Sequence, residues 1–128
     1  MGQQQLLLIV LGVIIVGIAV VVGINLFNAN ATNANRDGVI SDLNNLGAMA
    51  QQYYKKPTSM GGGGNEFIGW TIPTGLDSTA NGTYAPPTVT ANSVTIVGTG
   101  TELGTDGSSP VQATCTVGPT TISVAVNN

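Results

Sequence analysis

Residues 6–24 read LLLIVLGVIIVGIAVVVGI, a run of nineteen residues without a polar side chain. As an α-helix, this run would extend about 28 Å at about 1.5 Å per residue, enough to cross the hydrocarbon core of a bilayer. A chain of 128 residues is too small to bury such a helix in its own core. The sequence therefore predicts that this run, here called the apolar segment, lies in lipid or inside an equally apolar assembly.

Three interpretations of the apolar segment compete. The first is a cleaved secretory signal, because Ala29-Asn30-Ala31 has the small-x-small cleavage pattern, although no basic residue precedes the run and the run is long for a signal. The second is a plain membrane anchor, whose orientation is poorly specified because the first basic residue is Arg36. The third is a helix that first sits in the membrane and then packs into the core of a filament.

Small residues favour the third interpretation. Gly12, Ala19 and Gly23 are seven and four residues apart, so at 3.6 residues per turn they line one face of the predicted helix. A face of this kind lets helix backbones approach closely, which promotes packing where water gives no driving force. The alternative is that glycine is simply common in membrane helices. We call these three positions the small-residue face.

The first fifteen residues, MGQQQLLLIVLGVII, combine a hydrophobic first residue, a few short or polar positions and the start of an unbroken apolar helix. This opening resembles the mature N-terminus of a type IV pilin, and the resemblance covers about the first 55 residues. It implies a helical homopolymer whose precursor sits in the inner membrane and is handled by a prepilin peptidase and the pilus assembly machinery. The residues expected to take part in assembly are Met1, Gln3, Gln4, Gln5, Gly12, Ala19 and Gly23.

The first turn departs from the pilin pattern. In that family a glutamate there pairs with the terminal amine of a neighbouring subunit. With Met1 as the processed end, Gln5 occupies the glutamate's position, whereas cleavage after Gly2 would leave Gln3 first. A neutral amide costs less to bury than a carboxylate and still accepts a hydrogen bond from an amine. We therefore expect the glutamine amides to pair between chains, with less selective register.

After the apolar segment the pattern becomes polar and then amphipathic. Residues 25–38 (NLFNANATNANRDG) are weak helix formers, which predicts a bend or a loosened turn in the helix. Alternatively, Asp37 is the N-cap of a second helix. Apolar residues then recur at helical steps of four and three until Pro57 ends the pattern. The residues expected to pack this helix on the rest of the protein are Val39, Leu43, Leu46, Ala50 and Tyr53. One nearly continuous helix would be about 80 Å long, so its N-terminal half is expected to protrude.

The remainder of the chain is predicted to be a β-rich head. Residues 94–99 and 111–117 alternate in polarity, and residues 121–126 repeat the alternation after Gly118-Pro119, which predicts a C-terminal antiparallel hairpin. Weaker strands are expected at residues 67–72 and 83–85. The run of glycines at 61–64 lacks the lysine of a phosphate-binding loop and is interpreted as a flexible connection.

These elements give an α+β fold, in which the second half of a long, protruding N-terminal helix packs on a small antiparallel sheet. The predicted divisions are a helix over residues 1–56, a glycine-rich linker over 57–66 and a β-rich head over 67–128. Within the helix, residues 1–27 form the membrane or filament-core half and residues 28–56 the amphipathic half.

Composition argues against several classes of function. Three basic and six acidic residues give a net charge of −3, without the basic cluster that nucleic acid or anionic lipid attracts. There is no histidine, and the single Cys115 falls on the expected inward face of its strand. With isolated carboxylates only, no catalytic constellation, cofactor site or metal site is evident, so an enzyme is not expected. The sequons at Asn30 and Asn81 are possible glycosylation sites.

The sequence therefore predicts the structural subunit of an extracellular, type IV pilus-like filament. The alternatives are a minor pilin or secretion pseudopilin and a single-pass, membrane-tethered surface module. Electron conduction through stacked aromatics is a weaker alternative, because only six aromatic residues are available.

Overall fold

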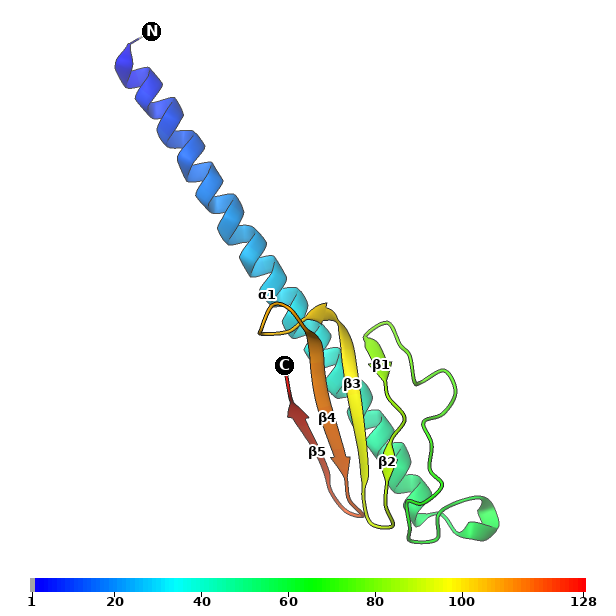
Figure 1. The fold of residues 1–128 in the computed structure, drawn as a ribbon. Coiled ribbons are helices and arrows are strands. Elements are labelled where there is room, and N and C mark those ends of the chain that lie inside the picture. The colour runs from blue at the N-terminus through cyan, green and yellow to red at the C-terminus, as the bar shows by residue number, and fades with distance from the viewer. Residues whose placement is uncertain (1) are drawn as a thin grey trace. The chain divides into compact units, whose positions relative to one another are not determined.

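The computed structural model describes residues 2–128, so Met1 lies outside the described residues. Its longest element is the helix α1 (Gln3–Lys55), which is followed by the short 3₁₀ helix η1 (Thr58–Met60) and five strands. The chain divides into two compact units, Met1–Ala31 and Thr32–Asn128. The predicted α+β class, a long N-terminal helix followed by a small antiparallel sheet, is confirmed (Figure 1).

Helix α1 runs without interruption through the asparagine-rich stretch. Asp37 therefore lies inside α1 and does not cap a second helix, and no loosened turn occurs at residues 25–38. Alanines alternate with the asparagines in this stretch and favour the helix. The second unit also holds its first turns in place, because the Thr32 hydroxyl donates a hydrogen bond of 2.8 Å to the Leu103 carbonyl. Tertiary contacts thus outweigh the weak local propensity.

The strands form one antiparallel sheet. They are β1 (Gly82–Tyr84), β2 (Thr88–Val89), β3 (Val94–Leu103), β4 (Pro110–Val117) and β5 (Ile122–Val126). The order across the sheet is β1-β3-β4-β5, and β2 pairs with β3 further along the same edge as β1. The predicted C-terminal hairpin is the β4–β5 pair, in register from Val117↔Ile122 to Ala113↔Val126. Strand β4 is therefore central, paired with β3 on its other side.

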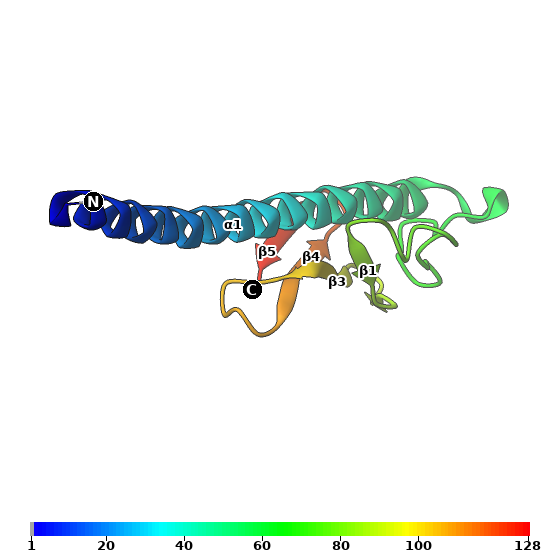
Figure 2. The ribbon, with the colours of Figure 1, turned by 90° about the horizontal axis from the view of Figure 1, so that it is seen from above.

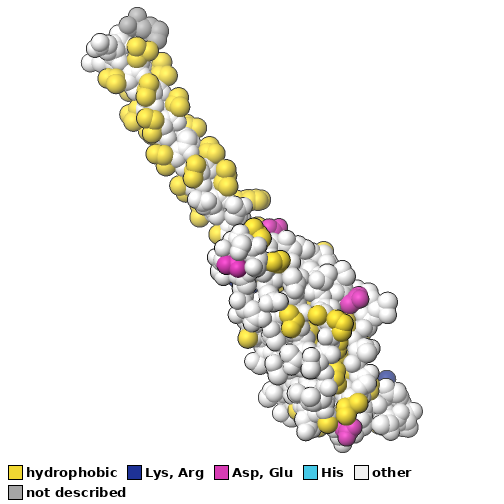
Figure 3. All heavy atoms as spheres, viewed as in Figure 1, with side chains coloured by type: hydrophobic (Ala, Val, Ile, Leu, Met, Phe, Trp, Pro, Cys, Tyr) yellow, Lys and Arg dark blue, Asp and Glu magenta, His cyan; other side chains and the backbone are white. Residues whose placement is uncertain are grey.

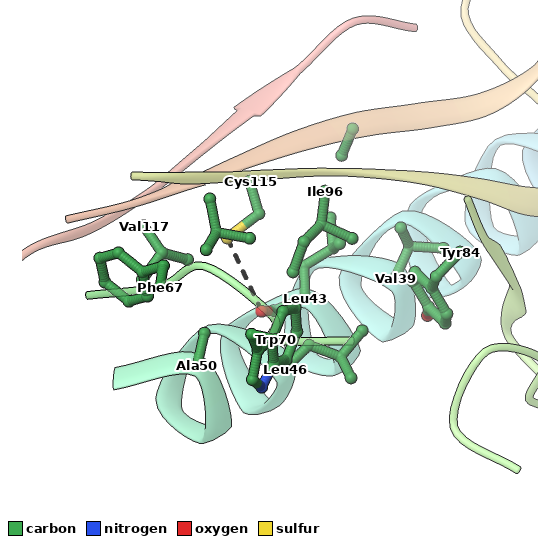
Figure 4. Packing of buried hydrophobic residues seen from close by; sticks show 12 residues of the cluster. Val39, Leu43, Leu46, Ala50, Phe67, Trp70, Tyr84, Ile96, Cys115 and Val117 are labelled. Carbon is green, nitrogen blue, oxygen red and sulfur yellow. Dashed lines mark hydrogen bonds between the residues drawn. The ribbon is translucent and has the colours of Figure 1, made fainter. Parts of the chain in front are cut away.

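One face of this sheet packs against the second half of α1. In Figures 1 and 2 the cyan-to-green part of α1 runs along the sheet, with β3, β4 and β5 on one side of it. Alternate residues of β3 and β4 are buried, as expected from their polarity pattern, and meet the apolar side of α1 (Figure 4). Gly47 is at the contact, where an added Cβ would lie 3.2 Å from a methyl group of Val117. Glycine there lets the helix approach the sheet closely.

The segment between α1 and β1 differs from the expected strand. Residues 67–72 form no strand; instead the Trp70 amide donates to the Phe67 carbonyl at 3.0 Å, which closes a turn. Both aromatic side chains are buried in the core, and the Phe67 ring lies 4.7 Å from that of Tyr54, centroid to centroid. The strand predicted at residues 67–72 is therefore wrong, because these apolar side chains are buried from a turn.

The glycine-rich run is also more ordered than the flexible connection expected from its composition. The amides of Gly63, Gly64 and Asn65 donate to the carbonyls of Tyr53, Lys56 and Tyr54, over 2.8–3.0 Å. The last carbonyls of an α-helix have no partner within the helix, and these bonds supply one. Gly61 and Gly64 adopt positive φ angles of 83° and 58°, which glycine takes without strain. The run therefore closes the C-terminal end of α1.

Candidate functional site

The apolar segment is the most unusual surface of the described chain. Its large side chains are each more than half exposed, from 51% at Val22 to 68% at Leu8 and Val13. Figure 3 shows hydrophobic side chains along the visible face of this part of the helix. By length and composition, α1 is able to cross a membrane. An apolar surface this continuous needs a cover of lipid or protein.

The small-residue face lies open on this segment. A Cβ added at Gly12 or Gly23 would meet no atom within 4 Å, and Ala19 is exposed on the same helix. No contact among the described residues therefore requires small side chains at these positions. What the face offers is room for another helix, since small residues bring backbones close enough for extensive van der Waals contact.

The first turn places three amide side chains in front of the apolar segment. Gln3, Gln4 and Gln5 are exposed, and the Gln5 backbone amide donates to the Gly2 carbonyl at 3.2 Å. No side-chain hydrogen bond of these glutamines occurs within residues 2–128. The expected pairing with a terminal amine involves Met1 and lies outside the described residues. The glutamine side chains remain available to groups of another chain.

The five residues expected to join the helix to the head lie against the sheet or beside it. Val39, Leu43, Leu46 and Ala50 are buried with at most 2% exposed. Tyr53 is half-buried, and its hydroxyl donates to the Ile68 carbonyl at 2.8 Å. The second unit therefore has a closed core of its own, which needs nothing from the apolar segment.

Asn35 is an important residue that the sequence reasoning missed. It is the one buried polar side chain of the described chain, with 9% exposed. Its amide nitrogen donates to the Asn81 carbonyl at 2.7 Å and to the Thr101 hydroxyl at 3.2 Å. Its amide oxygen accepts from the backbone of Thr101 and Glu102 at 3.1 and 3.3 Å. The signal available in the sequence was spacing, because Asn35 precedes Val39 by four residues and shares its helix face.

The bonds from Asn35 fall where the ladder between β3 and β4 is irregular. The register shifts between Thr99 and Leu103, so β3 amides in that interval lack their regular partners in β4. The Asn35 oxygen supplies an acceptor for two of them. This side chain thus ties the first turns of α1 in the second unit to the sheet.

A second polar cluster surrounds Asp42. One carboxylate oxygen, Oδ2, accepts hydrogen bonds from Tyr84 at 2.5 Å, Thr79 at 2.8 Å and Asn81 at 3.1 Å. Burial raises the pKa of the Asp42 carboxyl, but these bonds outweigh burial and hold that pKa below its usual value. Burial and the neighbouring Asp42 carboxylate raise the pKa of the Tyr84 hydroxyl. Asp42 is therefore an anion at neutral pH.

The same cluster bears on the two sequons. The Asn81 amide nitrogen, the atom a sugar would join, is bonded to Asp42 in a half-buried position. Asn30 is exposed on α1. Of the two asparagines, Asn30 is thus the more accessible to a modifying enzyme.

The described residues offer little for catalysis. Within residues 2–128 no group of three histidine, cysteine or acidic side chains is placed to hold a metal ion. Cys115 is fully buried, and burial raises the pKa of its thiol to about 11. A thiol of that kind is a weak nucleophile at neutral pH.

Comparisons of the chain with protein-family models, curated proteins and solved structures give no match.

Proposed function

We propose that this protein is the structural subunit of an extracellular filament of the type IV pilin kind, which polymerises through its apolar segment. The observation that carries the proposal is the exposure of every large side chain of that segment, in a chain whose second unit has a closed core of its own. Such a segment must be shielded from water, and the apolar segments of neighbouring copies can provide this cover. The resemblance of residues 1–15 to a mature pilin N-terminus supports this choice.

The small-residue face supports assembly over a plain anchor. The hydrophobic effect does not favour the transfer of the apolar segment from lipid into a helix bundle, because both surroundings are apolar. Close van der Waals packing then decides, and small residues on one face promote it. Residues 1–35 also contain no charged side chain, so adjacent copies of the segment carry no like charges that repel.

The closed core of the second unit is consistent with a precursor that waits in the membrane, already folded, before assembly. Because residues 32–128 pack among themselves, the precursor would fold while its apolar segment is in the inner membrane. Assembly then exchanges lipid for neighbouring helices without refolding the head. A prepilin peptidase and the assembly machinery are the partners that this route requires.

The direct test is to examine material sheared from the surface of cells that produce the protein. We expect filaments in electron micrographs, this chain as their main component by mass spectrometry, and a density map with residues 6–24 at the filament centre. Particles of single copies in detergent or nanodiscs, with no filaments on the cells, would favour the membrane-tethered module. Filaments in which this chain is a trace component would favour a minor pilin or pseudopilin.

A further inference from the structure

The second unit carries a groove of about 310 Å³ beside α1. Its walls come from residues 42–52 of α1 and from the segment that leads to β1. Leu46, Met49 and Leu76 supply apolar surface, while Asn45 and Gln52 are exposed amides. The remaining lining residues are Asp42, Ala48 and Thr79. A groove with apolar walls and polar side chains suits a long side chain that has an apolar stem and a charged end.

The charge in the groove is that of Asp42. Its Oδ2 atom accepts all three hydrogen bonds of the cluster, and within residues 2–128 no donor reaches Oδ1. Since Oδ1 has no partner but is not a buried atom, it is open to solvent. The three donors are neutral, and within residues 2–128 no cation is among the groups that shift the pKa of Asp42. Asp42 thus presents an anion without a counter-cation.

The cations that could match it are few. The chain has three basic residues, and two of them, Lys55 and Lys56, are adjacent and exposed at the end of α1. Lys55 lies thirteen positions after Asp42 in α1, which amounts to about 20 Å along the helix. A lysine side chain extends only about 6 Å, so the lysines cannot reach the groove of their own chain. A Lys55 or Lys56 side chain in the groove must therefore come from a second copy.

We propose that the groove of one subunit receives the Lys55-Lys56 pair of a second copy, with the ammonium at Asp42 and the stem against Met49 and Leu76. The proposal rests on the proposed filament, because polymerisation is what brings copies side by side. If the two helices run parallel, the contact offsets neighbouring copies by about 20 Å along α1. The contact thereby restores the register selection that the neutral Gln5 does not provide.

The test combines charge variants in the full chain. Asn45→Lys places a positive charge in the groove, and Asn44→Lys places the same charge at the next, exposed position, which does not line the groove. Exposed ion pairs contribute about 0.2–1 kcal/mol, so we expect Asn45→Lys to lower filament yield by a factor of about 1.4 to 5 and Asn44→Lys to leave it unchanged.

Crosslinking gives a second measurement. Filaments of the Asn45→Cys, Lys56→Cys double variant, oxidised before denaturation, should run as ladders of multiple subunits, whereas each single variant should not. Cys115 is buried and remains unreacted under these conditions. Equal yields from the two lysine variants, or filaments of the double variant without ladders, would overturn the groove contact while leaving the filament intact. A wild-type chain that forms no filament would overturn both proposals.

Discussion

A large effect on stability is expected at Asn35, where one amide makes three hydrogen bonds from α1 to β3 and one to Asn81, just before β1. Asn35→Ala removes all four and leaves two β3 amides and the Asn81 carbonyl without their partner. A net contribution of about 0.5–1.5 kcal/mol per bond gives a loss of about 2–4 kcal/mol, since water reaches part of this region. Alanine also gains about 0.5 kcal/mol in helix propensity, which slightly offsets the loss.

Asn44→Ala is the matched control for this change. Asn44 lies exposed on the same helix, so its replacement has the same propensity gain without the lost bonds. We expect it to leave the free energy of unfolding within about 0.5 kcal/mol of the wild type, or slightly above it.

The assay is urea unfolding of the full chain in a mild detergent, followed by the fluorescence of Trp70. This residue is the one tryptophan of the chain and is 6% exposed, so its emission reports the core of the second unit. With a slope of about 1–2 kcal/mol per molar urea, the midpoint of Asn35→Ala should fall by about 1–3 M. A midpoint within error of the Asn44→Ala control would refute the role assigned to Asn35.

Three further predictions concern assembly and pH. Replacing Gly12, Ala19 or Gly23 by leucine should reduce filament yield without reducing membrane insertion, because overpacking costs about 1–3 kcal/mol per site. The matched control Val13→Leu should leave the filament yield unchanged. Full yield from all three variants of the small-residue face would show that this face plays no part in assembly. Gln5→Leu should impair assembly more than Gln5→Glu, which still pairs with an amine, and the opposite order in a yield assay would contradict this. Three hydrogen-bond donors lower the pKa of Asp106 to about 2. The ionised carboxylate therefore stabilises the folded protein fully above pH 3.8, the unfolded-state pKa, and this contribution is lost as the pH falls toward 2. The melting temperatures of the wild type and Asp106→Asn should converge over that pH interval.

Much of the fold followed from local patterns. Nineteen apolar residues in succession require a helix with an apolar cover, whatever the rest of the chain does. The four-three spacing from Val39 to Ala50 marked the side of α1 that is buried, and strict alternation in residues 111–117 marked the inward face of β4. These features depend only on the periods of helix and strand, which a single sequence displays. The small-residue face and the glutamine turn were found in the same way, and their part in assembly stays a prediction.

Only the tertiary structure decided which residues distant in sequence form hydrogen bonds with one another. Asparagines 33 and 35 look alike in the sequence, but only Asn35 meets the irregular edge of β3, 66 residues further on. That contact supports a helix through a stretch of weak helix formers. Asp42 acquires three hydrogen-bond donors only because Thr79, Asn81 and Tyr84 fold back on it. Periodicity reports which side of an element is apolar; which polar groups find partners depends on the register between elements, and register is set by the packed core.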